Sequence, residues 1–218
     1  MTAAKICGIT NIEDALAVTA AGASAIGLNF APSPRRVTVE KACEIASALP
    51  PFITRVGLFV NEDLQAIKDM VARVGLDAVQ LHGDESPEFA EALRPIRVIK
   101  AVRIADRQDV RDAERYPGCT ILFDAKSKRA RGGTGIRFDL DLIMDVAYLD
   151  RVIVAGGLNP ENVATVVQKV RPYAVDVSSG VEMSPGRKDP SKLKRFMQAV
   201  RAADLAGSTN GPTDMPPG

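Results

Sequence analysis

The chain has 218 residues, 46% of them hydrophobic, and its 28 basic and 27 acidic residues give a formal net charge of +1. This length allows one or two domains, and the scattered charges predict no basic surface for nucleic acid or for an anionic membrane. The sequence has no run of about 18 apolar residues and no pattern of a secretion signal, so we expect a cytoplasmic protein with no membrane span. We expect its partner to be a small molecule.

Three cysteines, Cys7, Cys43 and Cys119, are an odd number spread along the chain, which is typical of free thiols in a reducing compartment. The sequence has a single histidine, His82, and no cysteine pair with the spacing of a zinc ligand set. We therefore predict no metal site.

Short runs of β-branched and apolar residues alternate with segments of helical periodicity along the whole chain. Because the runs are almost continuously hydrophobic, they are typical of strands buried on both faces of a parallel sheet. The predicted strands are Lys5 to Cys7, Ala25 to Phe30, Arg55 to Val60, Ala78 to Leu81, Val98 to Ala101, Thr120 to Phe123, Val152 to Ala155 and Ala174 to Val177.

The segments between these runs carry helix start signals. Thr10 or Asn11 can cap the first helix, Asn61 can cap the third ahead of two acidic residues, and Pro160 and Pro190 fit first-turn positions. The predicted helices are Asn11 to Ala21, Val39 to Ala48, Asn61 to Val74, Pro87 to Leu93, Asp106 to Arg115, Asp139 to Val146, Pro160 to Val170 and Pro190 to Ala203.

This alternation predicts an α/β fold, a single-domain (β/α)8 barrel. An open doubly wound sheet, which uses a similar pattern with fewer strands, is the alternative. We assign residues 1–205 to the barrel. Residues 206–218 are rich in Gly, Ser, Thr and Pro and are predicted to be a flexible tail.

Functional groups of such barrels lie where strands end, and two strand ends carry groups suited to proton transfer. Cys7 ends the first strand, and Asp124 follows the sixth, where burial would raise the pKa of its carboxyl group. Facing each other across the barrel mouth, the thiol and the carboxyl group could act as base and acid. Alternatively, Cys7 is a small buried hydrophobe, and Asp124 is a loop residue paired with Lys126, Lys128 or Arg129.

Glycine-containing loops follow the seventh and eighth strands, the usual phosphate-binding position of these barrels. Their bare backbone N–H groups could hold a phosphorylated substrate, although such glycines can also simply form tight turns. A third cluster, Gly132 to Gly135, lies in a long loop and is weaker evidence for a phosphate-binding site. The phosphate-binding candidates are Gly156, Gly157, Ser179 and Gly180.

Three further polar residues are candidates for substrate binding. Arg35 follows Ser33-Pro34 in a stiffened loop and has a fork of donors suited to a carboxylate, although it could be a solvated basic turn. His82 and Asp176 lie at strand ends, where each could contact substrate or merely satisfy a neighbouring backbone group.

Taken in chain order, the motifs resemble those of the phosphoribosylanthranilate isomerase family from about Lys5 to Phe196. They are KICGIT, SPRR, VGLFVN, VQLHGDE, LFDAK, GGTG, AGGLNPENV and DVSSGVEMSPGRKD. The resemblance implies a cofactor-free Amadori rearrangement in tryptophan biosynthesis, with Cys7 as general base and Asp124 as general acid. It also implies that Arg35 binds the anthranilate carboxylate, with Arg36 as a one-residue ambiguity, and that Asp176 lies near the ribose hydroxyls.

In the implied relay, Asp124 protonates the furanose ring oxygen, the ring opens to an iminium ion, and the Cys7 thiolate removes the C2′ proton. A thiol of ordinary pKa, about 8.5, is only slightly ionised at neutral pH, so the site must favour the thiolate. Lys5, on the same face of the strand, could supply positive potential.

Two rivals remain. The histidine-pathway isomerase is similar but resembles two duplicated half-barrels with an aspartate ending the first strand, whereas Cys7 stands here. The second is a non-catalytic barrel that binds a phosphorylated metabolite, against which the presence of both Cys7 and Asp124 argues. The sequence leaves open whether the chain is a monomer or a homodimer.

Overall fold

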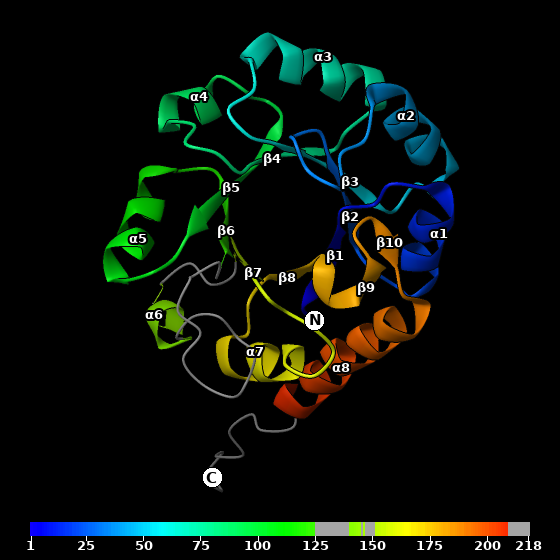
Figure 1. Ribbon diagram of the computed structural model, residues 1–218. Helices are drawn as coiled ribbons and strands as arrows, with labels where there is room; N and C mark the ends of the chain where they lie inside the picture. Colours follow the sequence, from blue (N-terminus) through cyan, green and yellow to red (C-terminus); the bar gives the residue numbers. More distant parts are fainter. Residues whose placement is uncertain (125–139, 145, 147–150, 209–218) are drawn as a thin grey trace, which may run out of the picture.

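The computed structural model describes residues 1–124, 140–144, 146 and 151–208. Parallel strands β1 to β8 pair in chain order, and β8 pairs with β1, so the sheet closes into a barrel. Helices surround this barrel on the outside (Figure 1). The predicted (β/α)8 fold is confirmed, and the open doubly wound sheet is excluded.

The eight strands agree with the predicted ones apart from small shifts at their ends. They are β1 (Ala3–Cys7), β2 (Ala25–Asn29), β3 (Thr54–Phe59), β4 (Ala78–Leu81), β5 (Arg97–Arg103), β6 (Thr120–Asp124), β7 (Val152–Ala155) and β8 (Ala174–Val177). The largest shift is in β5, which continues to Arg103 because this residue pairs with Asp124 at the end of β6.

Helices follow the strands in the predicted order. They are α1 (Ile12–Ala20), α2 (Val39–Ala48), α3 (Leu64–Val74), α4 (Pro87–Glu91), α5 (Arg107–Asp112) with the 3-10 turn η1 (Ala113–Arg115), α6 (Asp141–Met144), α7 (Val163–Val170) and α8 (Pro190–Ser208). Asn11 caps α1, because its side chain accepts a 2.7 Å hydrogen bond from the Asp14 amide. Pro190 is the first residue of α8, as its missing N–H predicts.

Some helix boundaries were predicted wrongly. The cap of α3 is Asp63, whereas Asn61 has φ 50° and its side-chain oxygen accepts from the Asp84 amide in the loop after β4. Helix α7 starts after Asn162, so Pro160 lies outside it. In both cases, the side chains of loop residues make contacts that keep these residues out of the helix, so the helix begins later than the sequence predicts.

A hairpin that the sequence analysis did not predict lies between β8 and α8. It comprises the 3-10 turn η3 (Ser179–Val181) and the antiparallel strands β9 (Glu182–Ser184) and β10 (Arg187–Lys188). The hairpin is fixed to the start of α1, because the Lys188 amide donates to Asp14 Oδ2 at 2.9 Å and Thr10 Oγ1 donates to the Gly186 carbonyl at 2.6 Å. Figure 1 shows it beside β1.

Apolar side chains fill the structure in two layers. One layer packs between the strands and the surrounding helices, and its largest members include Phe59, Phe123 and Phe196. The other cluster comes from strand residues that point into the barrel: Val56, Ala78, Ile99, Ala101, Leu122, Ile153, Ala155 and Ala174. This inner cluster is the floor beneath the polar residues at the strand ends.

The first strand is also tied to the last helix. The backbone N–H and the hydroxyl of Thr2 both donate to the Asp204 carboxylate, each at 2.8 Å.

Among the residues described, no helix combines the length and the hydropathy that crossing a membrane requires.

Candidate active site

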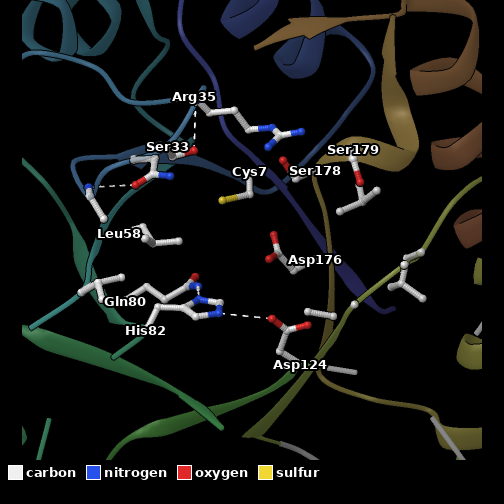
Figure 2. Close-up of a pocket in the computed structure, with 18 of the residues that line it drawn as sticks. Cys7, Ser33, Arg35, Leu58, Gln80, His82, Asp124, Asp176, Ser178 and Ser179 are labelled. Atoms are coloured by element: carbon white, nitrogen blue, oxygen red, sulfur yellow. Dashed lines mark hydrogen bonds and ion pairs between the residues drawn. The ribbon is translucent and has the colours of Figure 1, made fainter. Parts of the chain in front are cut away.

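A cavity of about 550 Å³ opens at the C-terminal ends of the strands, a size that suits a small ligand. It brings together nearly all of the site residues predicted from the sequence: Cys7, Arg35, His82, Asp124, Gly156, Gly157, Asp176 and Ser179. Figure 2 shows the Cys7 and Asp124 side chains pointing into the same open space. Arg36 lies elsewhere, in a separate hollow beside Phe30 and Met70.

Cys7 has room at the end of β1 because a glycine lies beside it. Gly27 is its neighbour on β2, and a Cβ atom there would lie 2.7 Å from Cys7 Sγ. Gly8, at φ +77°, turns the chain directly after Cys7, and a Cβ atom on it would collide with the Arg35 side chain. The two glycines thus let the thiol and Arg35 approach the cavity together.

Charged groups surround the thiol. Lys5 Nζ lies 2.7 Å from Asp176 Oδ1, and both side chains are almost fully buried. Burial raises the pKa of Cys7 and Asp176 raises it further, whereas Lys5 and Lys188 lower it without reversing the shift. The expected positive potential from Lys5 is therefore present, but the thiol is mainly protonated in the unliganded site.

Lys5 itself remains charged. Burial alone would lower its pKa, but the negative charge of Asp176 opposes this effect, and the pKa of Lys5 is raised. Lys5 is consequently a fixed cation, able to stabilise the thiolate once the proton has left Cys7.

Asp124 contacts the only histidine of the sequence. His82 Nε2 lies 3.2 Å from Asp124 Oδ2, and His82 Nδ1 lies 2.8 Å from the amide nitrogen of the buried Gln80 (Figure 2). Because the amide donates to Nδ1, the imidazole proton is on Nε2, directed at the carboxylate. One carboxylate oxygen is thus fixed by His82, and Asp124 lines the cavity.

The loops after β7 and β8 meet at the part of the cavity between Asp124 on β6 and Cys7 on β1. Gly156 and Gly157 have φ values of 91° and 75°, and the Asn162 side chain donates to the Gly157 carbonyl at 3.0 Å. Gly180 does not line the cavity, but it packs so closely that a Cβ atom would collide with the Leu158 carbonyl. Its role is thus to let the two loops touch, with Ser179 at the cavity wall.

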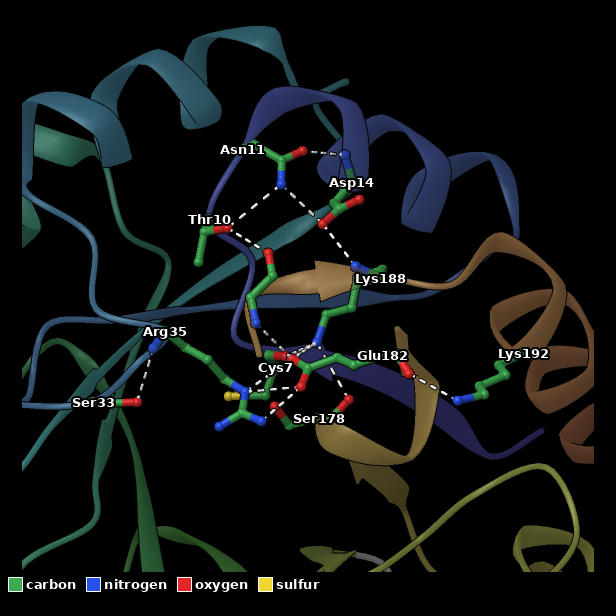
Figure 3. Close-up of polar contacts among 11 residues, drawn as sticks. Cys7, Thr10, Asn11, Asp14, Ser33, Arg35, Ser178, Glu182, Lys188 and Lys192 are labelled. Atoms are coloured by element: carbon green, nitrogen blue, oxygen red, sulfur yellow. Dashed lines mark hydrogen bonds and ion pairs between the residues drawn. The ribbon is translucent and has the colours of Figure 1, made fainter. Parts of the chain in front are cut away.

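Arg35 is held by Glu182. Arg35 Nε and Nη2 donate to the two carboxylate oxygens at 2.8 and 2.6 Å, and Lys188 Nζ donates to Glu182 Oε1 at 2.9 Å (Figure 3). Lys188 also donates to the Cys7 carbonyl at 2.7 Å. The arginine and the thiol are therefore joined through one buried network.

Gln80, Glu182 and Lys188 also shape the site but were not predicted from the sequence. Gln80 lies within a predicted strand, two residues before His82, so its position on the inner face was available as a signal. Glu182 and Lys188 stand in a stretch with Pro and Gly that is typical of a solvated turn, and nothing local marked them as buried.

Other expectations fall outside the described residues. These are the Gly132 to Gly135 cluster and the alternative partners of Asp124, namely Lys126, Lys128 and Arg129. Within the described ranges, no group of three or more His, Cys, Asp or Glu side chains is arranged to hold a metal ion.

Known proteins resemble this chain in sequence and in fold. Residues 4–199 match the family model described as N-(5'-phosphoribosyl)anthranilate (PRA) isomerase. The N-(5'-phosphoribosyl)anthranilate isomerase of Magnetococcus marinus is 50% identical over 205 residues, which cover 93% of this chain and 97% of the relative.

Solved structures extend the similarity. A phosphoribosyl anthranilate isomerase in complex with reduced 1-(o-carboxyphenylamino)-1-deoxyribulose 5-phosphate is 44% identical, with a TM-score of 0.83 over 93% of this chain and all (100%) of the other. Monomers generated from the dimeric enzyme of Thermotoga maritima are 42% identical, with a TM-score of 0.82 over 93% of this chain and 100% of theirs. The chain belongs to the N-(5'-phosphoribosyl)anthranilate isomerase family.

Proposed function

We propose that Cys7 and Asp124 are the general base and the general acid of the reaction that this chain catalyses. That reaction is the Amadori rearrangement of N-(5-phosphoribosyl)anthranilate to 1-(2-carboxyphenylamino)-1-deoxyribulose 5-phosphate, an aldose–ketose isomerisation in tryptophan biosynthesis. The observation that carries the assignment is that a thiol and a carboxyl group line one cavity together with two glycine loops.

Asp124 starts the reaction by giving a proton to the ring oxygen of the ribose. The C1′–O bond breaks, and the electron pair of the anthranilate nitrogen forms an iminium ion at C1′. His82 fixes Asp124 Oδ2 and so orients the carboxyl group, and we assign the proton transfer to the other oxygen. The positive nitrogen of the iminium ion then makes the adjacent C2′–H acidic.

Cys7 removes the C2′ proton, and the electrons of the C–H bond form the enolamine, which tautomerises to the ketone. The acting base is the thiolate form of Cys7, whose own proton has been released to solvent. Because burial raises the pKa of Cys7, this form is scarce in the empty site and is favoured in the occupied site, where the iminium charge adds to that of Lys5. The cation of the intermediate and the anion of the base thus stabilise each other.

Binding requires groups for both anionic ends of the substrate. We assign the phosphate to the backbone around Gly156, Gly157, Ser179 and Gly180, and the anthranilate carboxylate to Arg35. Arg35 is preferred to Arg36 because it lines the cavity. Asp176 and His82, which also line it, are assigned to the sugar.

The assignment is tested with Cys7→Ala and Asp124→Asn. Each should lower kcat about 100-fold or more with little change in KM, because proton transfer is lost while binding groups remain. The loss of anthranilate-substrate fluorescence measures turnover. Cys43→Ala and Asp84→Asn, made outside the cavity, should behave like the parent, and near-full turnover in either test variant would remove that residue from the mechanism.

Some broader assignments also belong to this proposal. We place the catalytic barrel in residues 1–205 and a tail in residues 206–218, of which α8 includes the first three. We further propose a cytoplasmic location, no nucleic-acid partner and a monomeric or homodimeric state. The dimeric Thermotoga maritima relative makes the homodimer a concrete option, which sedimentation at several protein concentrations tests.

A further inference from the structure

Glu182 is a buried carboxylate at which three parts of the site meet. It directly follows η3, which carries Ser179 of the phosphate loop, and its side chain is only 4% exposed. Oε1 accepts hydrogen bonds from Arg35 Nε and Lys188 Nζ, and Oε2 accepts from Arg35 Nη2 (Figure 3). Both oxygens are therefore engaged by cations that also reach the cavity or Cys7.

The bonds to Glu182 leave a defined part of Arg35 available. They use Nε and Nη2, which form one edge of the planar guanidinium group. The Nη1 side is not part of this contact, and Arg35 lines the cavity with 23% of its side chain exposed. A guanidinium group held by one edge presents its other donors to a second carboxylate in a fixed direction.

Lys188 supplies a positive charge that the cluster needs in order to attract a substrate carboxylate. With Glu182 alone, the charge of Arg35 would be neutralised, and a substrate carboxylate would gain little from binding it. Lys188, whose side chain is 1% exposed, adds a second positive charge, so that Arg35, Glu182 and Lys188 together carry a net charge of +1. One further carboxylate brings the cluster to neutrality.

Fold stability alone is a weak reason to bury such a cluster. A buried ion pair is often replaced by apolar side chains without loss, because removing two charges from water costs about as much as their attraction returns. The same chain places other arginine–glutamate pairs on its surface, such as Arg73 with Glu40, where both side chains are more than half exposed at 61% and 66%. The Lys100–Glu85 pair is equally buried without lining the cavity, so burial alone does not mark a site residue. The contacts of this cluster with Arg35, which lines the cavity, and with the Cys7 carbonyl point to a role at the site.

We propose that Glu182, held by Lys188, is a positioning residue that aims Arg35 at the carboxylate of the aromatic substrate. This inference rests on the proposed function, in which Arg35 binds that carboxylate. Glu182 thereby determines specificity for a carboxylated aryl group without touching the substrate itself.

The test compares two substrates in the parent and in Glu182→Gln. One is N-(5-phosphoribosyl)anthranilate, and the other is the analogue made from aniline, which lacks the carboxylate. Product formation is followed by chromatography, so that both are measured in the same way. The quantity of interest is the ratio of kcat/KM for the two substrates, because a general loss of folded protein lowers both values and leaves the ratio unchanged.

Glu182→Gln should lower this ratio at least 10-fold, mainly through a higher KM for the carboxylated substrate, since an amide cannot orient Arg35 and Lys188 together. An unchanged ratio would overturn the inference. If Glu182→Gln does not fold because Lys188 loses its partner, the double variant Glu182→Gln/Lys188→Met removes that unpaired charge, and its ratio is judged by the same criterion.

Arg35→Met separates this inference from the proposed function. If Arg35→Met lowers the ratio and Glu182→Gln does not, only the positioning role of Glu182 fails. If Arg35→Met leaves the ratio unchanged, the assignment of Arg35 fails, and the inference about Glu182 fails with it. The matched control is Glu40→Gln, which breaks an exposed arginine–glutamate pair and should leave the ratio unchanged.

Discussion

The two sides of the barrel mouth hold their reactive groups in different ways. Cys7, on the side of β1 and β8, lies among ionised groups that form the pairs Lys5–Asp176 and Lys188–Glu182. Asp124, on the side of β4 and β6, is held instead by a directed chain of imidazole and amide through His82 and Gln80. The exposed Arg103 also lines the cavity on this side.

The difference corresponds to the two tasks. The base must change its charge during the reaction. Where the fixed charges around a thiol nearly cancel, the charge of an intermediate can shift the protonation equilibrium of that thiol. The acid must point one oxygen at the ring, and hydrogen bonds of fixed direction achieve this. Variants that disturb one side alone should thus have separable effects.

The largest effect is expected from Gly27→Ala, which disturbs only the Cys7 side. The added methyl group would lie 2.7 Å from Cys7 Sγ and must displace the thiol. A shift of about 1 Å in a reacting group can cost about 100-fold in kcat. Steady-state fluorescence measures the loss, and circular dichroism verifies the fold; parental turnover would show that the thiol position is not critical.

A smaller effect, of opposite sign in two variants, is expected in the titration of Cys7. Lys5→Met removes a charge that lowers the pKa of Cys7 and should raise this pKa, whereas Asp176→Asn removes a charge that raises it and should lower it. The two shifts should be opposite in direction. The rate of Cys7 alkylation by iodoacetamide against pH, followed by mass spectrometry, reports both.

In these variants, alkylation should move to higher pH with Lys5→Met and to lower pH with Asp176→Asn. If the alkylation profile moves in the same direction in both variants, Lys5 and Asp176 do not have opposite effects on the pKa of Cys7. Cys43, which lies on α2 away from the cavity, serves as the internal control in each sample.

The smallest effect is expected on the Asp124 side. Gln80→Leu removes the partner of His82 Nδ1, and the loss of about 1 kcal/mol from one neutral hydrogen bond lowers kcat about fivefold. The alkylation profile of Cys7 should stay as in the parent. A shift in that profile would show that the two sides are coupled more closely than the contacts indicate.

The fold was predictable because each strand is marked locally. Runs such as Val152–Ala155 are short and apolar throughout, as a strand buried on both faces requires, and their alternation with helices defines the barrel. Cys7 and Asp124 were found for the same reason, since each stands where such a run ends. The boundaries that failed, at Asn61 and Pro160, depend on contacts within and between loops.

The network behind Arg35 was not predictable in this way. Glu182 and Lys188 lie in a short hairpin without periodicity, and their burial results from contacts with α1 and with Arg35, far away in the sequence. A charged residue beside Pro and Gly is locally indistinguishable from a solvated turn. The three-dimensional packing alone distinguishes the two.

The two hydrogen bonds between Thr2 and Asp204 have a consequence for how the chain can be connected. Because β1 begins where α8 approaches its end, a short linker could join the two without crossing the barrel mouth. New ends could then be opened in a surface loop remote from the cavity, such as the turn between α2 and β3. The circular order of the strands, rather than the point at which translation starts, is what this architecture requires.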